Sequence, residues 1–475
     1  MIARHTFLYV GARGLAAALN MASVAVFTRL APVETYGAYL LVLSWALVLY
    51  GATCQWPKFS FFALYDEARA PAQVGTVARL LAAMLVLAGA AALLAALFGL
   101  ASPRTAAILV AAVLGMTLFE AASEIARARL EAGPVALAIV VRAVLILGLG
   151  SFALAATGDP ADLVLAVAAA NVLAALPALR AILPILRGGA SRLEARRLVA
   201  YGWPLVLSFG IAALAQTSDR LIIGRMVGPE ELGAYGAIAD FLRQSFVVFG
   251  ESVALSLISI AKRDARAGGM AAAESALGDA ARALTLVAAF GAVFVLGFDD
   301  LIVAILLGPG YRAQALTLAP VLLVASIFLM FRSYYFGQVI YFTRTSHLDA
   351  VASLVLLVAV AGLSVLLIPR MGVMGAALAF AVGQGLACLV FVLGARLAPA
   401  GERVRMPVPG ADLLGIVLVA LACGTLLYGI GQVPGGRSAA GQAARLGLLA
   451  AGFLLAAWHF NVVGIADALR RRRAA

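Results

Sequence analysis

The chain has 475 residues, of which 64% are hydrophobic and only 12% are charged. Together with a mean hydropathy of +1.04, this composition excludes a water-soluble globular protein of this length and indicates a polytopic membrane protein. Lys and Arg number 35 against 23 Asp and Glu. We expect the resulting net charge of +12 in loops on the cytoplasmic side of a membrane, not on a surface that binds nucleic acid.

Apolar runs of about 20 residues, the length that crosses a bilayer, recur along the chain. The first, of about 23 residues, suits a spanning helix better than a signal peptide, so we expect no cleavage. The segment Asp299–Arg312 contains an apolar piece too short to cross, which predicts an extension of the ninth helix or an interfacial turn. The runs together predict an all-α fold of about 14 transmembrane helices, near residues 7–30, 38–57, 77–101, 105–126, 135–156, 162–186, 199–223, 235–260, 279–298, 314–340, 349–368, 372–396, 411–430 and 444–466.

Basic side chains are distributed unevenly between the loops that these helices define. With the N-terminus inside, the segments on that side hold about three times as many Lys and Arg residues as the opposite segments, which is a positive-inside bias. We therefore expect a multi-pass protein of the cell inner (cytoplasmic) membrane with both termini in the cytoplasm. The basic linker Arg187–Arg197 predicts a boundary between two halves of the chain.

A polar hairpin sequence occurs twice, as FTRLAPVETYGAY at Phe27–Tyr39 and as IGRMVGPEELGAY at Ile223–Tyr235. We expect each copy to form a tight turn outside the bilayer, in which the glycine supplies backbone freedom. The repeat indicates that the chain is built twice, and the alternative is a chance match between two turns. Without a gap, the copies share Arg29/Arg225, Glu34/Glu230, Gly37/Gly233, Ala38/Ala234 and Tyr39/Tyr235.

The position of the two copies gives the duplication a geometry. The intervening spans return the chain to the same side of the membrane, so both halves point the same way, related by an axis along the membrane normal. This predicts an N-lobe at residues 1–190 with the first six helices and a C-lobe at residues 191–397 with the next six, around a central cavity. Residues 398–475 then add two transmembrane helices and a basic C-terminal tail.

Three stretches resemble a known family. The sequence YGWPLVLSFGIAALAQTSDRLIIGRMVGPEELGAYG at Tyr201–Gly236 is similar to the seventh helix and following turn of polysaccharide transport flippases, the Wzx-type members of the multidrug/oligosaccharidyl-lipid/polysaccharide (MOP) exporter superfamily. LLGPGYRAQALTLAPVLL at Leu306–Leu323 and IPRMGVMGAALAFAVGQ at Ile368–Gln384 resemble the same family. The resemblance extends from Arg13 to about Leu397, and it identifies the superfamily better than the substrate.

The resemblance implies a transporter and no enzyme. Such proteins move a polyprenyl-diphosphate-linked oligosaccharide from the inner to the outer leaflet by alternating access between two lobes. The expected partners are that lipid-linked oligosaccharide and membrane lipids, with a polymerase or glycosyltransferases of the same pathway left open, and no nucleic acid. The lipid II flippases of the superfamily do the same job in outline and also have 14 helices, whereas the drug-exporting branch usually has 12.

Ionisable side chains inside the predicted spans are the candidate site residues, because such groups are costly at mid-membrane and generally face a wet cavity or a partner. On the predicted eighth helix, Asp240, Arg243, Gln244 and Glu251 follow three- and four-residue spacing and share one face. Glu251 is the deepest and the first choice for coupling to protons, sodium or the membrane potential. The alternative for Asp240 and Arg243 is an ion pair within the helix.

Two groups of charges are candidate gates. Asp219 and Arg220 on the seventh helix lie at a height similar to that of the Asp240 and Arg243 pair, and the four could close an outer gate. Alternatively, Asp219 and Arg220 only end the helix and fix the turn.

A second candidate gate lies toward the cytoplasm. On the fourth helix, Glu120 and Glu124 with Arg127 suggest an inner gate or a proton site. A local pair between Glu124 and Arg127 is the alternative.

Arginine forks can bind a diphosphate headgroup away from water, and four arginines lie inside predicted spans: Arg13, Arg142, Arg243 and Arg332. Arg13 and Arg243 are the first candidates because they belong to the opening helices of the two halves. The resemblance to lipid II flippases, in which arginines of helix one line a cationic cavity, implies the same for Arg13, and snorkelling to the inner headgroups is the alternative.

The predicted tenth helix is unusually polar. With Arg332, the residues Tyr334, Tyr335 and Gln338 combine rings and an amide group that suit sugar stacking and hydroxyl recognition. Interfacial anchoring is the alternative for the tyrosines, and the preferred one for Tyr335. Several helices also contain prolines that predict kinks where the lobes flex, at Pro177, Pro184, Pro204 and Pro320.

Other function classes have weaker support. A drug or cation antiporter of the same superfamily predicts a carboxylate deep in the first helix, and Phe7–Leu30 contains no Asp or Glu. An integral membrane enzyme needs either a soluble domain, for which no loop is long enough, or clustered acids and histidines on one loop. His5, His347 and His459 have no plausible partner nearby. We therefore expect no catalytic residue, no metal and no cofactor. The three cysteines fit no metal or redox motif and are expected to be buried small hydrophobes, at Cys54, Cys388 and Cys423.

Overall fold

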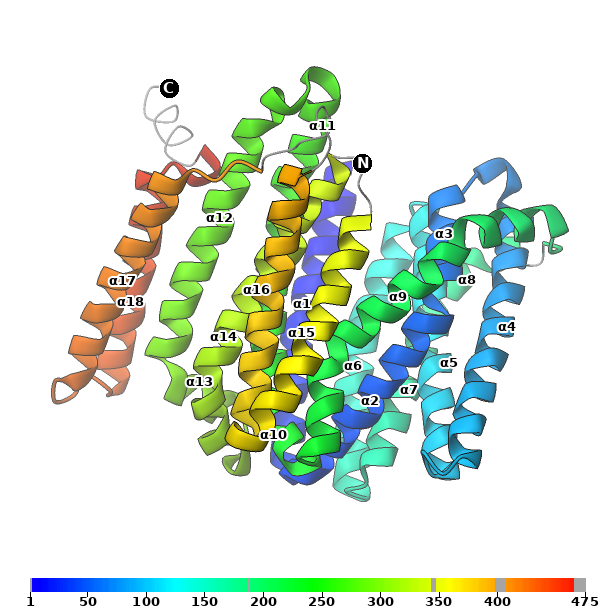
Figure 1. Cartoon of the computed structure of the whole chain (residues 1–475), viewed down its shortest axis with the longest axis horizontal. Helices are drawn as coiled ribbons and strands as arrows, with labels where there is room; N and C mark the ends of the chain where they lie inside the picture. The colour runs from blue at the N-terminus through cyan, green and yellow to red at the C-terminus, as the bar shows by residue number, and fades with distance from the viewer. Residues whose placement is uncertain (1, 187, 343–346, 398–405, 465–475) are drawn as a thin grey trace. The chain divides into compact units, whose positions relative to one another are not determined.

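The computed structural model describes residues 2–186, 188–342, 347–397 and 406–464, without the side chains of residues 2–10, 347 and 464. Within these ranges all regular secondary structure is helical (Figure 1). The basic C-terminal tail after residue 464 lies outside the described residues. The helices of the first part of the chain are α1 Ile2–Leu30, α2 Val33–Thr53, α3 Gln55–Leu64, η1 Glu67–Arg69, α4 Ala70–Leu97, α5 Pro103–Ala128, α6 Ala132–Ala156, α7 Pro160–Ala174 and α8 Leu176–Leu186.

The second part of the chain continues in the same way. Each predicted span overlaps a helix of the structure, which confirms the all-α fold. The helices are α9 Arg192–Met226, α10 Pro229–Val253, η2 Ala254–Ile258, α11 Ser259–Gly268, α12 Met270–Gly297, α13 Asp299–Leu306, η3 Pro309–Tyr311, α14 Arg312–Tyr334, η4 Phe336–Tyr341, α15 His347–Met371, α16 Val373–Leu397, α17 Gly410–Gln432, α18 Ala439–His459 and η5 Val462–Gly464.

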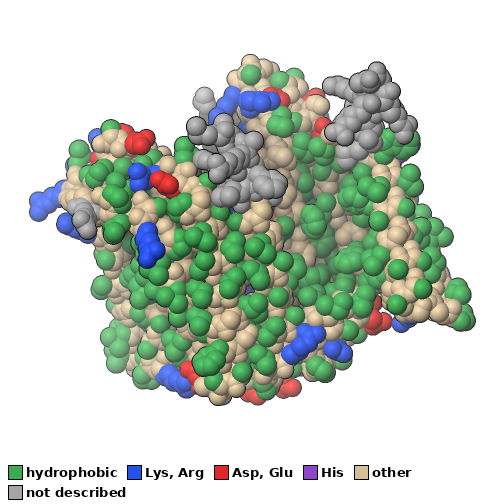
Figure 2. All heavy atoms as spheres, turned by 180° about the vertical axis from the view of Figure 1, so that it is seen from behind, with side chains coloured by type: hydrophobic (Ala, Val, Ile, Leu, Met, Phe, Trp, Pro, Cys, Tyr) green, Lys and Arg blue, Asp and Glu red, His purple; other side chains and the backbone are tan. Residues whose placement is uncertain are grey.

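The helices have the length and composition of membrane spans. In the described residues, twelve are long and apolar enough to cross, and thirteen if α7 and α8, which are bent by 49°, count as one span. Large hydrophobic side chains remain exposed, such as Phe98 and Leu207. On the face drawn in Figure 2, hydrophobic side chains predominate, and charged side chains gather toward the helix ends. Such a surface suits lipid contact, and the count of fourteen spans stays a prediction.

Several predicted spans are interrupted. The second divides at Cys54 into α2 and α3, and the sixth bends between α7 and α8, where Pro177 occupies the first turn of α8 and cannot continue the hydrogen bonding of the preceding helix. The eighth span passes from α10 through a π-helical turn, η2, into α11. The segment after the ninth span is not an extension of it, because α12 ends at Gly297 and α13 is a separate short helix, and its interfacial position stays a prediction. Pro184, Pro204 and Pro320 lie within continuous helices.

Capping side chains determine where several helices begin. At the start of α7, the side chain of Asp159 accepts a hydrogen bond from the backbone N–H of Ala161 at 2.8 Å, and Arg104 donates to the same carboxylate at 2.6 Å. The Ala161 bond, with Arg104 second, holds the pKa of Asp159 below its ordinary value. Serine side chains cap three further helices in the same way, at Ser102, Ser191 and Ser438.

The chain divides into two compact units. Unit 1 comprises Met1–Ala237, Leu306–Gln314 and Val360–Ala379. Unit 2 comprises Ile238–Ile305, Ala315–Ala359 and Phe380–Ala475. The predicted N-lobe and C-lobe follow the sequence repeat, and they stay a prediction.

The helices end and begin at equivalent positions of the two hairpins, and both hairpins lie in unit 1. The helices before them end at Leu30 and Met226, and the helices after them begin at Val33 and Pro229, which are equivalent positions of the repeat. In the second turn, the residue that needs the backbone freedom of glycine is Gly228, because its φ is +126°.

The explanation given above for Gly37 and Gly233 is therefore wrong, because both lie inside helices. They serve close approach instead. A Cβ on Gly37 would lie 1.7 Å from the carbonyl oxygen of Pro229, and one on Gly233 would lie 2.1 Å from the carbonyl oxygen of Val33. Since Val33 and Pro229 are themselves equivalent in the repeat, α2 and α10 cross through reciprocal contacts.

A third segment of unit 1 packs on the first hairpin. The backbone N–H of Gly308 donates to the side-chain oxygen of Thr28 at 3.1 Å, and the hydroxyl of Tyr311 donates to the carbonyl oxygens of Ala31 and Pro32 at 2.9 and 3.0 Å. These residues belong to the LLGPGY part of one stretch that resembles the flippase family. The stretch thus fixes the turn between α1 and α2.

Candidate functional site

An ion pair that the sequence did not predict lies in unit 1. Lys58 on α3 donates to Glu120 on α5 at 2.9 Å, and the lysine side chain is only 12% exposed. Its ammonium group lies 5.3 Å from the centre of the Tyr50 ring on α2, a cation–π distance. The second predicted span ends near residue 57, so hydropathy alone places Lys58 just beyond it. The break at Cys54 brings it back against α5.

Arg142 on α6 lies beside this pair. Its guanidinium carbon is 4.8 Å from the centre of the Phe119 ring, the residue before Glu120. Its Nε atom is buried and has no hydrogen-bond partner among the described residues. A buried donor of this kind is costly, and it is available to an anion that enters the site.

The second acidic residue of α5 is engaged locally. Arg127 donates to Glu124 at 2.9 Å, one helical turn away. This confirms the local pair that we gave as an alternative. Glu120 and Glu124 therefore have different partners, and a role of either in an inner gate or in proton transfer stays a prediction.

Asp219 and Arg220 do not end a helix, so that part of the alternative is wrong. The helix α9 continues to Met226, and both side chains are buried, Asp219 completely and Arg220 to 7% exposure. The hydroxyl of Tyr235 on α10 donates to Asp219 at 2.7 Å. Tyr235 is the repeated tyrosine of the second hairpin, so this bond ties that hairpin to the helix that precedes it.

The other half of the predicted outer gate lies in unit 2. Asp240 and Arg243 are half-buried on α10, and the Arg243 guanidinium carbon lies 4.3 Å from the centre of the Phe380 ring. The gate and the use of Arg243 for substrate stay predictions. The same holds for Arg13, a half-buried residue of α1 in unit 1.

Glu251 stands next to an irregular turn. The helix α10 ends two residues later, and the following π-helical turn, η2, leads into α11. The ring of Tyr334 packs on Gly250, where an added Cβ would lie 2.5 Å from the ring atom Cδ2. Because π-helical turns are frequent at functional sites, the half-buried Glu251 remains the candidate coupling residue.

The predicted polar stretch of the tenth span is divided in two. Arg332 and Tyr334 lie at the end of α14, whereas Gln338 lies in η4. Gln338 donates to the carbonyl oxygen of Ser333 at 2.8 Å and accepts from Lys262 of α11 at 3.3 Å. The Nε atom of Arg332 is buried and has no hydrogen-bond partner among the described residues.

Tyr335 is not an interfacial anchor, contrary to our preferred reading. Its side chain is 1% exposed, and its hydroxyl donates to the carbonyl oxygen of Pro407. The prediction failed because hydropathy did not show that α14 ends one residue earlier and that the chain turns inward there.

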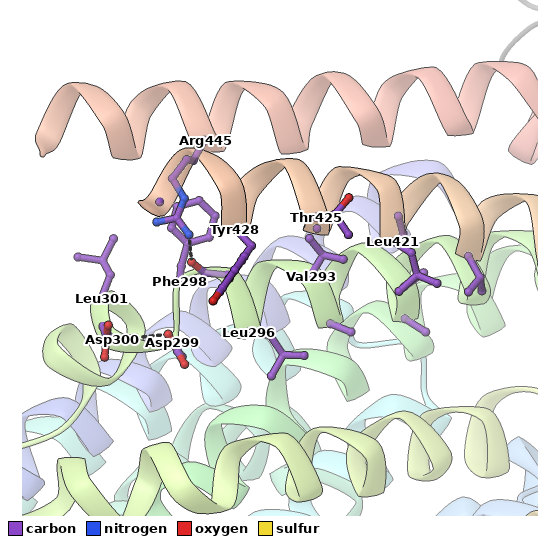
Figure 3. A pocket seen from close by; sticks show the side chains of 18 of the residues that line it. Val293, Leu296, Phe298, Asp299, Asp300, Leu301, Leu421, Thr425, Tyr428 and Arg445 are labelled. Carbon is purple, nitrogen blue, oxygen red and sulfur yellow. Dashed lines mark hydrogen bonds between the residues drawn. The ribbon is translucent and has the colours of Figure 1, made fainter. Parts of the chain in front are cut away.

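A large cavity in unit 2 was also missed (Figure 3). It has a volume of about 1100 Å³ and lies between α12, α14, α17 and α18. Its walls are mostly apolar, with Leu296 and Leu421 along them. One end is polar, and the charged residues there are Asp299, Asp300, Arg437 and Arg445. The sequence predicts the last two helices only as an addition to the two lobes, so their side chains are not among the predicted site residues.

The cysteines and the possible metal ligands can be located in the structure. All three cysteines are buried and unpaired, as expected, at Cys54, Cys388 and Cys423. In the described part of the chain, no three His, Cys, Asp or Glu side chains are grouped so that they could hold a metal ion.

Solved structures with the same fold are membrane transporters. The lipid II flippase MurJ in an inward closed conformation matches with a TM-score of 0.74 and 11% identity, over 96% of this chain and 99% of that chain. A multidrug resistance MATE family transporter of the MOP superfamily, in an inward-facing conformation, matches with a TM-score of 0.62 and 16% identity, over 80% and 94%. A MOP superfamily transporter from Pyrococcus furiosus matches with 0.54 and 13%, over 83% and 94%.

The sequence itself places the chain in a family. No curated protein matches it, but the family model described as polysaccharide biosynthesis protein matches residues 75–315, which is just over half of the chain. The resemblance to polysaccharide transport flippases is thereby confirmed. The chain belongs to the polysaccharide biosynthesis protein family and has the fold of the flippases and transporters of the MOP superfamily.

Proposed function

We propose that this protein is an inner-membrane flippase that moves a polyprenyl-diphosphate-linked oligosaccharide from the cytoplasmic to the outer leaflet by alternating access. The observation that carries the proposal is the presence of buried, unused arginine donors inside the spans. Arg142 and Arg332 each have an Nε atom without a hydrogen-bond partner in the described residues. Membership of the polysaccharide biosynthesis family supports the proposed substrate class.

The chemistry of the carrier explains why such arginines are needed. A diphosphate keeps its negative charge while it leaves the headgroup region, and moving an uncompensated charge to mid-membrane costs several kcal/mol. Arginine offsets this cost through two parallel N–H donors directed at phosphate oxygens. Around Arg142, the cations Arg142, Lys58 and Arg127 outnumber the carboxylates Glu120 and Glu124, so the cluster keeps a positive charge for the diphosphate.

The remaining candidates fill the other tasks of a flippase. Arg13 and Arg243 are further phosphate ligands, and Tyr334 with Gln338 would recognise sugar rings and hydroxyl groups. Asp219 and Arg220 with Asp240 would form the outer gate. The protein needs no cofactor in this proposal, and Glu251 would couple flipping to protons, sodium or the membrane potential.

Reconstitution tests the proposal directly. A fluorescent polyprenyl-diphosphate oligosaccharide is placed in one leaflet of vesicles that contain the purified protein. A reagent added on the other side quenches the fluorescence of molecules that have moved to the other leaflet. We expect Arg142→Gln and Arg332→Gln each to lower the flipping rate at least tenfold. Arg104→Gln is the control, because Arg104 is 66% exposed and pairs with Asp159 at the protein surface. Wild-type flipping no faster than in protein-free vesicles would refute the function.

The same experiment in cells gives an independent readout. Deletion of the protein should trap sugar-loaded carrier in the inner leaflet, and the site variants should restore export poorly although they insert normally.

A substituted-cysteine labelling of the turn between α17 and α18 would test the proposed orientation, which places that turn outside and both termini in the cytoplasm. Co-purification with a polymerase or with glycosyltransferases of the pathway would test the proposed partners.

A lipid II flippase is the second candidate. It is favoured by the match to a lipid II flippase over 96% of this chain, whereas the multidrug MATE transporter matches cover 80 to 83%. Competition in the vesicle assay between lipid II and the oligosaccharide carrier separates the candidates. The preferred substrate must lower the flipping rate of the less preferred one. A drug or cation antiporter is disfavoured by the absence of Asp and Glu from Phe7–Leu30.

A further inference from the structure

We propose that the cavity between α12, α14, α17 and α18 binds an aminophospholipid of the surrounding membrane, with its chains along the apolar walls and its zwitterionic headgroup at the polar end (Figure 3). This site is separate from the arginines proposed for flipping and does not depend on that function. The cavity lies entirely within unit 2.

The size and walls of the cavity indicate a lipid. Its volume of about 1100 Å³ is at the upper limit of pockets for drug-sized ligands, which are about 300 to 1,000 Å³. The walls along α12 and α17 carry Val293, Leu296 and Leu421, and Figure 3 shows these side chains in a row away from the charged end. An apolar space with charges at one end fits a hydrocarbon chain with a polar head.

The polar end lies where a headgroup would be. It is formed by the start of α13 and by the turn between α17 and α18, which contribute Asp299, Asp300 and Arg437. Helix ends of this kind lie at the membrane surface. The positive-inside rule predicts that this surface is the outer one, so the lipid would belong to the outer leaflet.

One buried cation is directed into this end. Arg445 on α18 is 7% exposed, and its guanidinium carbon lies 4.8 Å from the centre of the Phe298 ring. It donates to the carbonyl oxygen of Gly297 and to the side chain of Gln442. Its Nε atom is buried without a hydrogen-bond partner in the described residues. That donor is available to a phosphate oxygen.

The charge balance of the polar end selects the headgroup. Figure 3 shows the carboxylates Asp299 and Asp300 at the same end as Arg445. Arg437 also lines the cavity and donates to Asp300 at 3.2 Å, so the net charge there is close to zero. A diphosphate or another purely anionic head would be repelled by the two carboxylates. A head with one phosphate and one primary ammonium group meets complementary charges, with the phosphate at Arg445 and the ammonium at Asp299.

Native mass spectrometry of the purified full-length protein tests the proposal. After delipidation, the protein would receive phosphatidylethanolamine, phosphatidylglycerol and undecaprenyl phosphate in equal amounts. We expect wild type to retain one phosphatidylethanolamine in preference to the other two. Preferential retention of phosphatidylglycerol would overturn the headgroup assignment, and preferential retention of undecaprenyl phosphate would overturn the proposal in favour of a substrate path.

Two neighbouring residues of α17 give a matched pair of variants. Thr425 is exposed and lines the cavity, whereas Leu426 is also exposed but does not line it. Thr425→Trp should fill the cavity and lower retention of phosphatidylethanolamine at least tenfold, and Leu426→Trp should leave it unchanged. Equal retention by the two variants would overturn the site.

A third variant tests the ammonium contact. Asp299→Asn should remove the preference for phosphatidylethanolamine over phosphatidylglycerol, while total lipid retention stays within about twofold. An unchanged preference would overturn the charge argument. Each variant should unfold at the same temperature as wild type, which would show that the losses of lipid do not come from misfolding.

Discussion

The reciprocal glycine contacts of the two hairpins make a quantitative prediction. In Gly37→Ala, the new Cβ would lie 1.7 Å from the carbonyl oxygen of Pro229, and in Gly233→Ala it would lie 2.1 Å from that of Val33. Ordinary contacts begin near 3.4 Å, so the helices α2 and α10 must separate by more than 1 Å at this crossing. The obstructing atoms are backbone and cannot move aside as a side chain does.

The expected cost follows from measurements on overpacked interiors. Extra methyl groups in a packed core destabilise proteins by about 1 to 3 kcal/mol, and a backbone obstacle favours the upper part of that range. Glycine to alanine inside a helix would by itself stabilise by up to about 1 kcal/mol. The control is Gly89→Ala on α4, because nothing lies within 4 Å of a Cβ at that position. It should unfold at or above the wild-type temperature.

A double-mutant cycle distinguishes one crossing from two independent sites. Because both glycines belong to the same crossing, the first alanine already moves the helices apart, and the second should cost less than it does alone. Thermal unfolding in detergent provides the readout, with Gly37→Ala and Gly233→Ala each unfolding several degrees below wild type. Additive losses, or a loss in Gly37→Ala no larger than that in Gly89→Ala, would refute the reciprocal packing.

Three further variants probe single contacts. Gly308→Ala should lower the unfolding temperature, because its Cβ would collide with a backbone carbonyl of the first hairpin. Tyr235→Phe should cost about 1.5 to 3 kcal/mol, the range for a hydrogen bond to a charged group, since it removes the 2.7 Å bond to Asp219. Lys58→Met should lower the flipping rate more than it lowers stability, because Glu120 loses its counter-ion and the positive charge of the cluster falls.

Each of these variants has a contrasting control. Gly14→Ala has no atom within 4 Å of its Cβ and should be harmless, unlike Gly308→Ala. Tyr428→Phe alters an exposed hydroxyl and should leave the unfolding temperature unchanged. Lys58→Arg keeps the charge, so it should preserve flipping. If Lys58→Arg were as inactive as Lys58→Met, the shape of the side chain and not its charge would matter.

Apolar periodicity and length were sufficient to predict the helices, because each span must bury its own backbone hydrogen bonds in lipid. The turns of the repeated hairpin were also predicted, since helix ends need polar or special residues. Interruptions inside an apolar run were not predictable in the same way. Cys54 separates α2 from α3, and Ala254–Ile258 forms a π-helical turn, yet neither segment differs in hydropathy from its surroundings.

The candidate site was predicted only as a set of charged residues. Arg142, Arg332 and Glu251 could be selected, because an ionisable group is rare in an apolar run. Their partners could not, since Lys58 reaches Glu120 from 62 positions away in the sequence, and nothing in either segment indicates that contact. The cavity near Arg445 was missed for the same reason: its walls come from helices that are distant in the chain.

The reciprocal contacts favour duplication, which stays a prediction, over a chance similarity of two turns. A chance match of polar turn residues would explain shared glutamates and glycines in loops, but it would not place both glycines inside helices at equivalent positions. Gly37 faces the carbonyl group of Pro229, and Gly233 faces the carbonyl group of Val33. Val33 and Pro229 are equivalent positions of the repeat, as are the two glycines. Such a contact requires that the two segments meet through an approximate twofold relation. The glycines are therefore explained as a pair, because the crossing stays close only while both positions lack a side chain.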